Sequence, residues 1–234
     1  MNNGYLYVAT VKHNYYRAAK LSAISLKEFY PEAKTCIFTL PEWVDDETFE
    51  IFDHVFTNPP NHVRAKLWAL QYTPFKTTMY LDCDTYIEHE DISKAFDYLG
   101  DNDIIFTRNR PYNAKITKLS ETEEMIYHCG VFVYDRNSRT KKLMSDWYLK
   151  YCEQIKPGYD PSPYSDRVRP WDTFTMWYLL NKTEHKKLIK VGDFPSPDAR
   201  WNFVMGQRPS ELEEQPKIIT HYSIRKVFPN ANPV

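Results

Sequence analysis

The sequence predicts an α/β protein with a mostly parallel, twisted sheet flanked by helices, and three observations support this. Short apolar runs rich in β-branched and aromatic residues alternate with segments of helical period as far as about residue 90. The chain is 42% hydrophobic and 26% charged, which supplies a core and excludes a disordered protein. Its 234 residues suit one domain with one sizeable core.

The first part of the chain gives the clearest alternation. Pro41 and Pro74 end elements, and Asp45 is placed to cap a helix. We expect strands over 5–11, 34–40, 54–57 and 77–81, and helices over 17–30, 45–52 and 64–72.

Beyond residue 90 the pattern is looser. We expect helices over 92–99, 138–154 and 172–181, and strands over 103–107, 130–134, 187–191 and 217–220. The segment 156–170 holds four prolines and no apolar period, so it is predicted to be a long loop of the kind that often has a functional role.

Composition excludes several kinds of binding site. Only six glycines occur and no two lie closer than 14 residues, so neither a dinucleotide-binding glycine loop nor a P-loop can be assembled. The formal charge of −1 gives no overall attraction to nucleic acid or to anionic lipid. No apolar run is long enough to span a bilayer. The cysteines form no C-x-x-C pair, which favours reduced, partly buried thiols and a cytoplasmic location: Cys36, Cys83, Cys129 and Cys152.

Two acidic residues follow the strand expected over 77–81. Asp82 and Asp84 are two positions apart, so in extended chain their side chains lie on one face. The carboxyl ends of strands are the ligand-binding edge of an open α/β sheet. A hard divalent cation held there could neutralise a diphosphate, which the missing glycine loop cannot do. The simpler interpretation is that both acids only begin a solvated turn.

The residues around this pair raise its specificity, because the chain resembles the GT-A glycosyltransferases, and among them the glycogenin-like and galactosyltransferase-like group called family 8. The resemblance covers about residues 5–226 and is carried by seven blocks in order: Val8–Thr10 with Tyr15, Lys66–Leu67 sixteen residues before Asp82, Met79–Thr85, His128–Val131, Asp172–Thr173, Trp201–Asn202, and His221–Tyr222. In this chain His128–Cys129 stand where the family has Asn-Ser, and Thr173 stands where it has Gln.

The resemblance implies a GT-A domain over 1–234, with a nucleotide-binding half to about residue 90 and an acceptor half over about 91–234. It implies transfer of a sugar, plausibly a hexose, from a nucleotide-diphosphate donor that is UDP-linked, with retention of configuration and with Mn²⁺ or Mg²⁺ as cofactor. The metal ligands would be Asp82, Asp84 and His221. The donor-binding residues would be Ala9, Thr10, Tyr15, Lys66, Asp82, Cys83, Arg225 and Lys226, and the catalytic residues would be Asp172 and His128.

Each of these roles has a simpler alternative. Tyr15 could be a core residue, Asp172 could cap the helix that it begins, and Arg225 with Lys226 could be a solvated basic segment. A lone histidine such as His221 is more often a packed or exposed polar group than a metal ligand.

Two other functions fit parts of the sequence. A haloacid-dehalogenase-type phosphatase also has a strand-end Asp-x-Asp, and 191–198 resembles its downstream acidic motif. The glycine and threonine that this family has after the second aspartate are absent, because Thr85 and Tyr86 stand there. A catalytically silent sugar-nucleotide or carbohydrate-binding module would explain the replaced Asn, Ser and Gln.

The acceptor and the assembly state are open. A saccharide, a protein, a lipid-linked molecule or a nucleic acid could accept the sugar, and a homo-oligomer is possible. A nucleic-acid acceptor would use a local basic stretch that includes Arg108, Arg110, Tyr112, Lys115 and Lys118.

Overall fold

The computed structural model describes residues 2–109 and 117–228. In its first part, strands and helices alternate as expected, and Asp45 caps a helix with its side chain on the backbone N–H of Thr48. The elements are β1 (Asn3–Ala9), α1 (His13–Phe29), β2 (Thr35–Thr39), η1 (Pro41–Trp43), α2 (Asp46–Ile51), β3 (His54–Phe56), α3 (Lys66–Ala69), η2 (Leu70–Tyr72) and β4 (Thr77–Leu81).

The second part contains more short elements. They are β5 (Thr85–Ile87), η3 (Glu90–Lys94), η4 (Asp97–Leu99), β6 (Ile104–Arg108), β7 (Tyr127–Asp135), α5 (Ser138–Gln154), η6 (Asp166–Val168), α6 (Asp172–Lys182), α7 (His185–Leu188), β8 (Val191–Asp193), η7 (Asp198–Trp201), β9 (Phe203–Val204), η8 (Pro209–Leu212), β10 (Ile219–His221) and α8 (Ile224–Val227).

The main sheet has seven strands in the order β3-β2-β1-β4-β7-β6-β8. All neighbouring pairs are parallel except those of β7, which runs antiparallel to both β4 and β6. A second, three-stranded sheet has the order β5-β10-β9. The strand order reverses between β1 and β4, and in a doubly wound sheet this is where the carboxyl ends of two strands open a crevice for a ligand. The predicted mostly parallel α/β sheet is confirmed.

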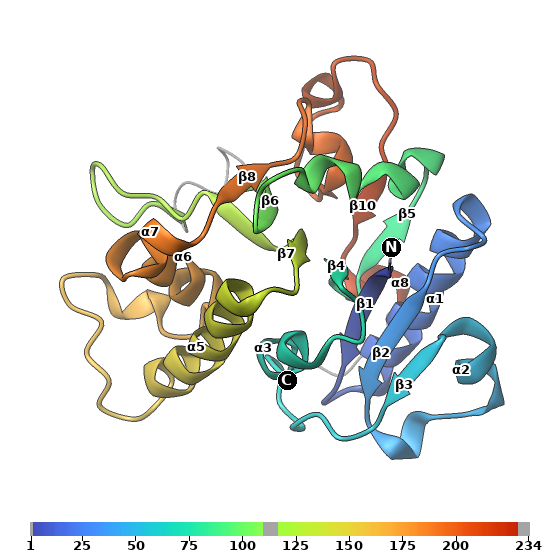
Figure 1. Ribbon diagram of the computed structural model, residues 1–234, viewed down its shortest axis with the longest axis horizontal. Helices are drawn as coiled ribbons and strands as arrows, with labels where there is room; N and C mark the ends of the chain where they lie inside the picture. The colour runs from blue at the N-terminus through green and yellow to red at the C-terminus, as the bar shows by residue number, and fades with distance from the viewer. Residues whose placement is uncertain (1, 110–116, 229–234) are drawn as a thin grey trace.

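Helices cover both faces of the main sheet (Figure 1). On one face α1 and α2 bury a cluster that includes Tyr7, Leu26 and Ile37. On the other face α3, α5 and α6 bury a second cluster that includes Phe132 and Trp147. Strands with apolar side chains on both faces are expected where helices cover both, and β1, β2 and β4 follow this pattern.

Several expectations in the second part are wrong in detail. The segment expected as one helix over 92–99 forms the two 3₁₀ turns η3 and η4. The strand expected over 187–191 is instead the end of α7 followed by β8. His185, the first residue of α7, is buried, and its Nε2 lies 2.7 Å from Asp146 Oδ2 on α5. Strands β5 and β9 are too short to give a periodic signal, and they are not predicted.

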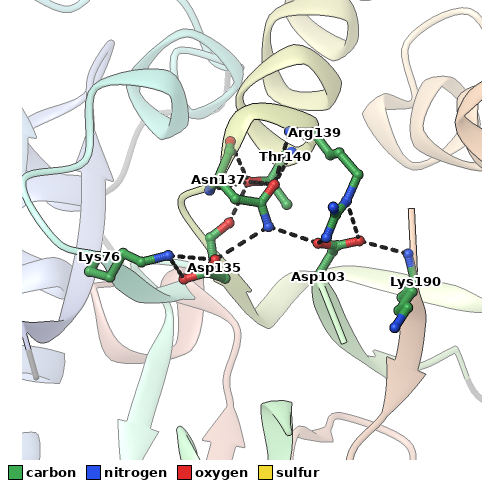
Figure 2. Close-up of polar contacts among 7 residues, drawn as sticks. All are labelled: Lys76, Asp103, Asp135, Asn137, Arg139, Thr140 and Lys190. Atoms are coloured by element: carbon green, nitrogen blue, oxygen red, sulfur yellow. Dashed lines mark hydrogen bonds and ion pairs between the residues drawn. The ribbon is translucent and has the colours of Figure 1, made fainter. Parts of the chain in front are cut away.

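The amino edge of the sheet holds a network of charged residues (Figure 2). Buried Asp103, just before β6, accepts hydrogen bonds from the Arg139 guanidinium at 2.6 and 3.1 Å, from Asn137 Nδ2 at 2.7 Å and from the backbone N–H of Lys190 at 2.9 Å. Asn137 also caps α5 with its side-chain oxygen. Asp135, at the end of β7, pairs with Lys76. The network joins the starts of β6, α5 and β8.

All four cysteines are free: Cys36, Cys83 and Cys129 are buried, and Cys152 is half-buried. In the described residues, no helix has the length and the apolar character needed to cross a membrane.

Candidate donor and metal site

The candidate site lies at the reversal of strand order, where β1 and β4 end. Asp82 and Asp84 follow β4 directly, and the segment 8–10 closes β1. A cavity opens at this point and includes seven of the residues named from the sequence. It is lined by Val8, Thr10, Tyr15, Val63, Arg64, Ala65, Lys66, Tyr80, Asp82, Cys83, Asp84 and His221.

The second sheet brings His221 to the two aspartates. Strand β10 pairs antiparallel with β5, and His221 is opposite Thr85, the residue after Asp84. His221 Nε2 lies 3.0 Å from Asp84 Oδ1, and the backbone carbonyl of Asp84 accepts a hydrogen bond from the N–H of Tyr222 at 2.8 Å. Residues 137 positions apart in the chain thus meet at one point.

Asp82, Asp84 and His221 fit a divalent cation. Each offers one ligand atom, and these atoms lie within 4.8 Å of one another. Two carboxylate oxygens and one imidazole nitrogen form a donor set that suits Mn²⁺, and carboxylates also suit Mg²⁺. Within the described residues, no hydrogen bond reaches Oδ2 of Asp82, so this oxygen is available to a ligand.

Asn202 fixes the orientation of the His221 ring by contacting Nδ1, the ring nitrogen that does not face the aspartates. Its Oδ1 is 3.0 Å from His221 Nδ1, and its Nδ2 donates to Thr107 Oγ1 at 3.2 Å. Thr107 in turn donates to the carbonyl of Val131 at 3.1 Å. With Nδ1 donating to the fully buried amide, Nε2 is left facing the aspartates, and a second partner of this kind commonly sets the tautomer of a metal-binding histidine.

Lys66, the first residue of α3, joins two carboxylates of the site, the half-buried Asp82 and the buried Asp172. Its Nζ lies 3.3 Å from Asp82 Oδ1 and 3.0 Å from Asp172 Oδ2, and it donates to the carbonyl of Cys129 at 2.8 Å. Burial alone would raise the pKa of Asp82, but the charges of Lys66 and His221 outweigh it, so the net pKa is lowered. Burial alone would lower the pKa of Lys66, but Asp172 and Asp82 raise it. Asp82 is therefore ionised and Lys66 is charged at neutral pH.

Asp172 is the first residue of α6, but its side chain does not cap the helix. The capping position is Trp171, which makes no side-chain cap bond. The Asp172 carboxylate, only 5% exposed, instead faces Lys66 and Arg64, and Arg64 Nε lies 3.3 Å from its Oδ1. A buried carboxylate between two cations is a constrained charge beside the cavity, and the capping interpretation is wrong.

His128 lies on the other side of Asp82, in β7. Its ring contacts the ring of His221, with centroids 5.4 Å apart, and its Nδ1 accepts a hydrogen bond from the N–H of Gly130 at 3.1 Å. Burial and the neighbouring His221 lower the pKa of His128 to about 3, so the ring is neutral. A Cβ on Gly130 would lie 2.5 Å from Asp82 Oδ2, so only glycine leaves room for that carboxylate.

The other residues expected to bind a donor take different positions. Thr10 and Tyr15 line the cavity, and burial and the Asp84 charge raise the pKa of Tyr15. Cys83 is buried and its Sγ donates to the carbonyl of Val8 at 3.1 Å, which ties β4 to β1. Ala9 is fully buried within β1 and does not line the cavity.

Arg225 and Lys226 lie on α8, exposed and outside the cavity lining. Arg225 is close enough to Tyr15 for its charge to act on that phenol. Of the basic stretch considered for nucleic acid, Arg108 is paired with Asp193, and Arg110, Tyr112 and Lys115 lie outside the described residues.

Three residues of the site were not expected from the sequence. Arg64 reaches Asp172, Asn202 orients His221, and Tyr80 donates its hydroxyl to Asp82 Oδ1 at 2.7 Å. Arg64 precedes the Lys66–Leu67 block by two positions and Asn202 belongs to a quoted block, so both were within reach of motif reasoning. The backbone of Val11 was not foreseeable: its φ of 68° is unusual for a β-branched residue, and its N–H donates to Asn61 Oδ1 at 2.9 Å.

No protein-family model matches the chain, and no curated protein matches it by sequence. Solved structures do match. A galactosyltransferase, LgtC, crystallised with donor and acceptor sugar analogues, aligns over 94% of this chain and 86% of its own, with a TM-score of 0.53 and 16% identity. The glycosyltransferase GlyE of Streptococcus pneumoniae TIGR4 aligns over 95% of this chain and 54% of its own, with a TM-score of 0.64 and 13% identity. Mouse xyloside xylosyltransferase 1 aligns over 94% and 97%, with a TM-score of 0.53 and 12% identity.

These proteins are glycosyltransferases of the GT-A class, and the chain described here has their fold. At such low identity the likeness establishes the fold, and the chemistry must be argued from the site.

Proposed function

We propose that this protein is a metal-dependent glycosyltransferase that moves a sugar from a nucleotide-diphosphate sugar, UDP-linked, to an acceptor, with retention of configuration. The observation that carries the proposal is the convergence of Asp82, Asp84 and His221 beside the cavity at the β1/β4 edge. In a doubly wound sheet this edge is the ligand-binding edge, and the three side chains fit a divalent cation.

The cavity supplies the groups that such a donor needs. Tyr15 would stack on the base and Thr10 would contact it, while Ala9, buried behind the cavity wall, would only support the end of β1. Lys66 would reach the ribose or the phosphates from α3. Asp82, Asp84 and His221 would hold Mn²⁺ or Mg²⁺, which when bound neutralises charge on the diphosphate leaving group.

Two further residues, Asp172 and His128, are assigned to the sugar. Asp172 would present its buried carboxylate to the reacting carbon, and neutral His128 would offer a polar contact without adding charge. Arg225 and Lys226 would contact the departing diphosphate. The segment 156–170 would close over the donor and exclude water.

Isothermal titration with UDP tests the proposal, performed with and without Mn²⁺ and followed by a screen of UDP-sugars by mass spectrometry. We expect binding that depends on the metal and turnover of at least one donor. Asp84→Ala should abolish both while leaving the fold intact, and Asp46→Ala, which removes an exposed carboxylate from α2, should change neither. Unchanged activity in Asp84→Ala would refute the assignment.

The structure weakens the phosphatase alternative. Asp193 and Asp198 of its downstream motif both contact Arg108, through its side chain and its backbone N–H, and neither belongs to the described group of possible metal ligands. The remaining alternative is a silent binding module, motivated by His128 and Thr173 at positions where the family has Asn and Gln. Hydrolysis of a UDP-sugar by the purified protein would exclude it, and p-nitrophenyl phosphate turnover would favour the phosphatase.

A further inference from the structure

Side chains of helix α5 donate hydrogen bonds to the backbone carbonyls at the start of α6 and just before it. Three side chains on its inner face, at Trp147, Tyr151 and Gln154, are spaced four and three residues apart and therefore lie on one face of the helix. All three are 5% exposed or less. Each directs a donor at a backbone carbonyl in the segment 168–172, where the carbonyls of Val168 and Trp171 also accept the backbone N–H groups of Trp171 and Phe174.

Together these donors reach five consecutive carbonyls. Gln154 Nε2 lies 3.2, 2.8 and 2.9 Å from the carbonyl oxygens of Val168, Arg169 and Trp171. The hydroxyl of Tyr151 lies 3.4 Å from that of Pro170. Trp147 Nε1 donates to the carbonyl of Asp172 itself at 2.9 Å.

The amide of Gln154 is fixed in this orientation. Its Oε1 accepts a hydrogen bond from Thr175 Oγ1 at 2.7 Å, which leaves Nε2 to point at the three carbonyls. Gln154 is a polar side chain with 1% exposure, and a buried amide is costly unless its bonds are made. The arrangement thus fixes one backbone conformation at the entry to α6.

This fixed backbone affects the position of one side chain, the carboxylate of Asp172. The Asp172 carboxylate is held on its outer side by Lys66 at 3.0 Å and Arg64 at 3.3 Å, and both of these cations line the cavity. Trp147, on α5, holds the same residue by its backbone carbonyl. Two cations could draw a flexible carboxylate toward the metal ligand Asp82, and the bonds from α5 oppose that movement.

We propose that Trp147, Tyr151 and Gln154 are positioning residues that set the place of the Asp172 carboxylate relative to the transferred sugar. The proposal rests on the proposed function, because it assigns Asp172 a role toward a sugar donor. A displacement of about 1 Å at a reacting group can lower a rate about 100-fold. The effect should therefore appear in turnover and not in the affinity for the nucleotide, which is bound by other residues.

The test uses the full chain with Mn²⁺ and the UDP-sugar on which the wild type is most active. Trp147→Phe keeps an aromatic ring but removes the donor to Asp172. Gln154→Met keeps the length of the side chain but removes its three contacts with carbonyls and the acceptor of the Thr175 hydroxyl. Tyr5→Phe is the matched control: it removes a buried hydroxyl that donates to a backbone carbonyl, that of Ile92 at 2.8 Å, on the opposite face of the sheet. Turnover, donor KM, UDP affinity and thermal stability are measured for each.

We expect kcat to fall about 10- to 100-fold in Trp147→Phe and Gln154→Met, while donor KM and the Kd for UDP change less than about threefold. Tyr5→Phe should lose stability without losing kcat. A kcat within threefold of wild type in Trp147→Phe would overturn the proposal. It would also be overturned if Tyr5→Phe lost kcat together with stability, because the loss of kcat in the other variants could then be due to lost stability alone. If Gln154→Met fails to fold, Trp147→Phe decides alone. A wild type with no turnover of any donor would overturn the proposed function, and this inference with it.

Discussion

Two clusters of acidic residues lie at opposite edges of the same sheet, and they are built differently. At the amino edge, both oxygens of Asp103 are bonded, each by two donors from Asn137, Arg139 and the backbone of Lys190 (Figure 2). At the carboxyl edge, Asp82 receives Tyr80 and Lys66 on one oxygen only, and Asp84 and His221 share a single contact.

The difference teaches how to separate a structural acid from a functional one. The Asp103 cluster is complete without any ligand, because arginine, asparagine and backbone donors fill its oxygens. In the Asp82 cluster, by contrast, one carboxylate oxygen of Asp82 accepts no hydrogen bond from the described residues, and the cluster lines a cavity. Fully bonded buried charges act in stability, whereas partly bonded ones that converge on a cavity are candidates for function.

The largest effect that would sharpen this comparison is expected for Asp82→Asn. Under the proposed function Asp82 is a charged metal ligand beside the diphosphate. Its loss should lower turnover by at least about 1,000-fold, because the metal and its ligands would carry most of the charge stabilisation. Steady-state assays with a UDP-sugar and Mn²⁺ measure it. The melting temperature should change little, and a large fall in it would place Asp82 in the same category as Asp103.

Asp103→Ala should have the opposite effects: a large fall in melting temperature and no change in turnover. It leaves the Arg139 guanidinium, the Asn137 amide and the Lys190 N–H without their buried acceptor. Removing one partner of such a network costs about 3 kcal/mol, or roughly 6–12 °C in melting temperature for a chain of this size. Calorimetry measures the loss. Turnover per folded molecule below the melting transition should match wild type, and a specific loss of activity would break the comparison.

The pH dependence of stability should also distinguish Asp103. Burial alone would raise its pKa, but Arg139 and the backbone N–H of Lys190 lower it overall. A lowered folded-state pKa contributes stability that is present above the unfolded value of about 3.9 and is lost as pH falls through the folded value. Asp103→Asn should therefore show a shallower decline than wild type below about pH 4 in melting temperatures measured from pH 3 to 7. Parallel curves for the two proteins would contradict this.

The smallest effect is expected at the rim of the same network. Lys76 is more than half exposed and pairs with Asp135. Exposed pairs contribute about 0–1 kcal/mol, so Lys76→Ala should lower the melting temperature by no more than about 3 °C. A loss as large as that of Asp103→Ala would show that the network acts as one unit, and a double-mutant cycle between the two positions would measure the coupling.

Much of the fold could be predicted from the sequence where local signals were strong. Strand β4 and helix α5 match their predicted bounds, because the first is a run of β-branched and large apolar residues and the second begins with Asn137 as a cap. The antiparallel direction of β7 could not be predicted, since periodicity does not record direction. Strands of two or three residues, such as β5 and β9, are defined by their partners alone.

The residues of the site also divide into those that local sequence predicts and those that it does not. Asp82 and Asp84 could be predicted from local sequence, and His221 only through the family resemblance. Arg64 and Asn202 acquire their roles from distant partners: Asn202 reaches Thr107 and His221 through contacts that span 95 and 19 positions. A motif can point to these two residues, but local sequence does not show which distant partners they contact. The roles of all these residues toward a donor stay predictions until the experiments above are performed.

The pairing of β10 with β5 has a consequence for synthesis and proteolysis. The two carboxylates are translated long before the imidazole that completes their trio, and β10 is a short strand near a stretch of 3₁₀ turns and loops. An amino-terminal fragment that ends between 205 and 218 contains all seven strands of the main sheet but lacks His221. Such a fragment lacks the proposed third metal ligand, so intact mass should accompany every activity measurement.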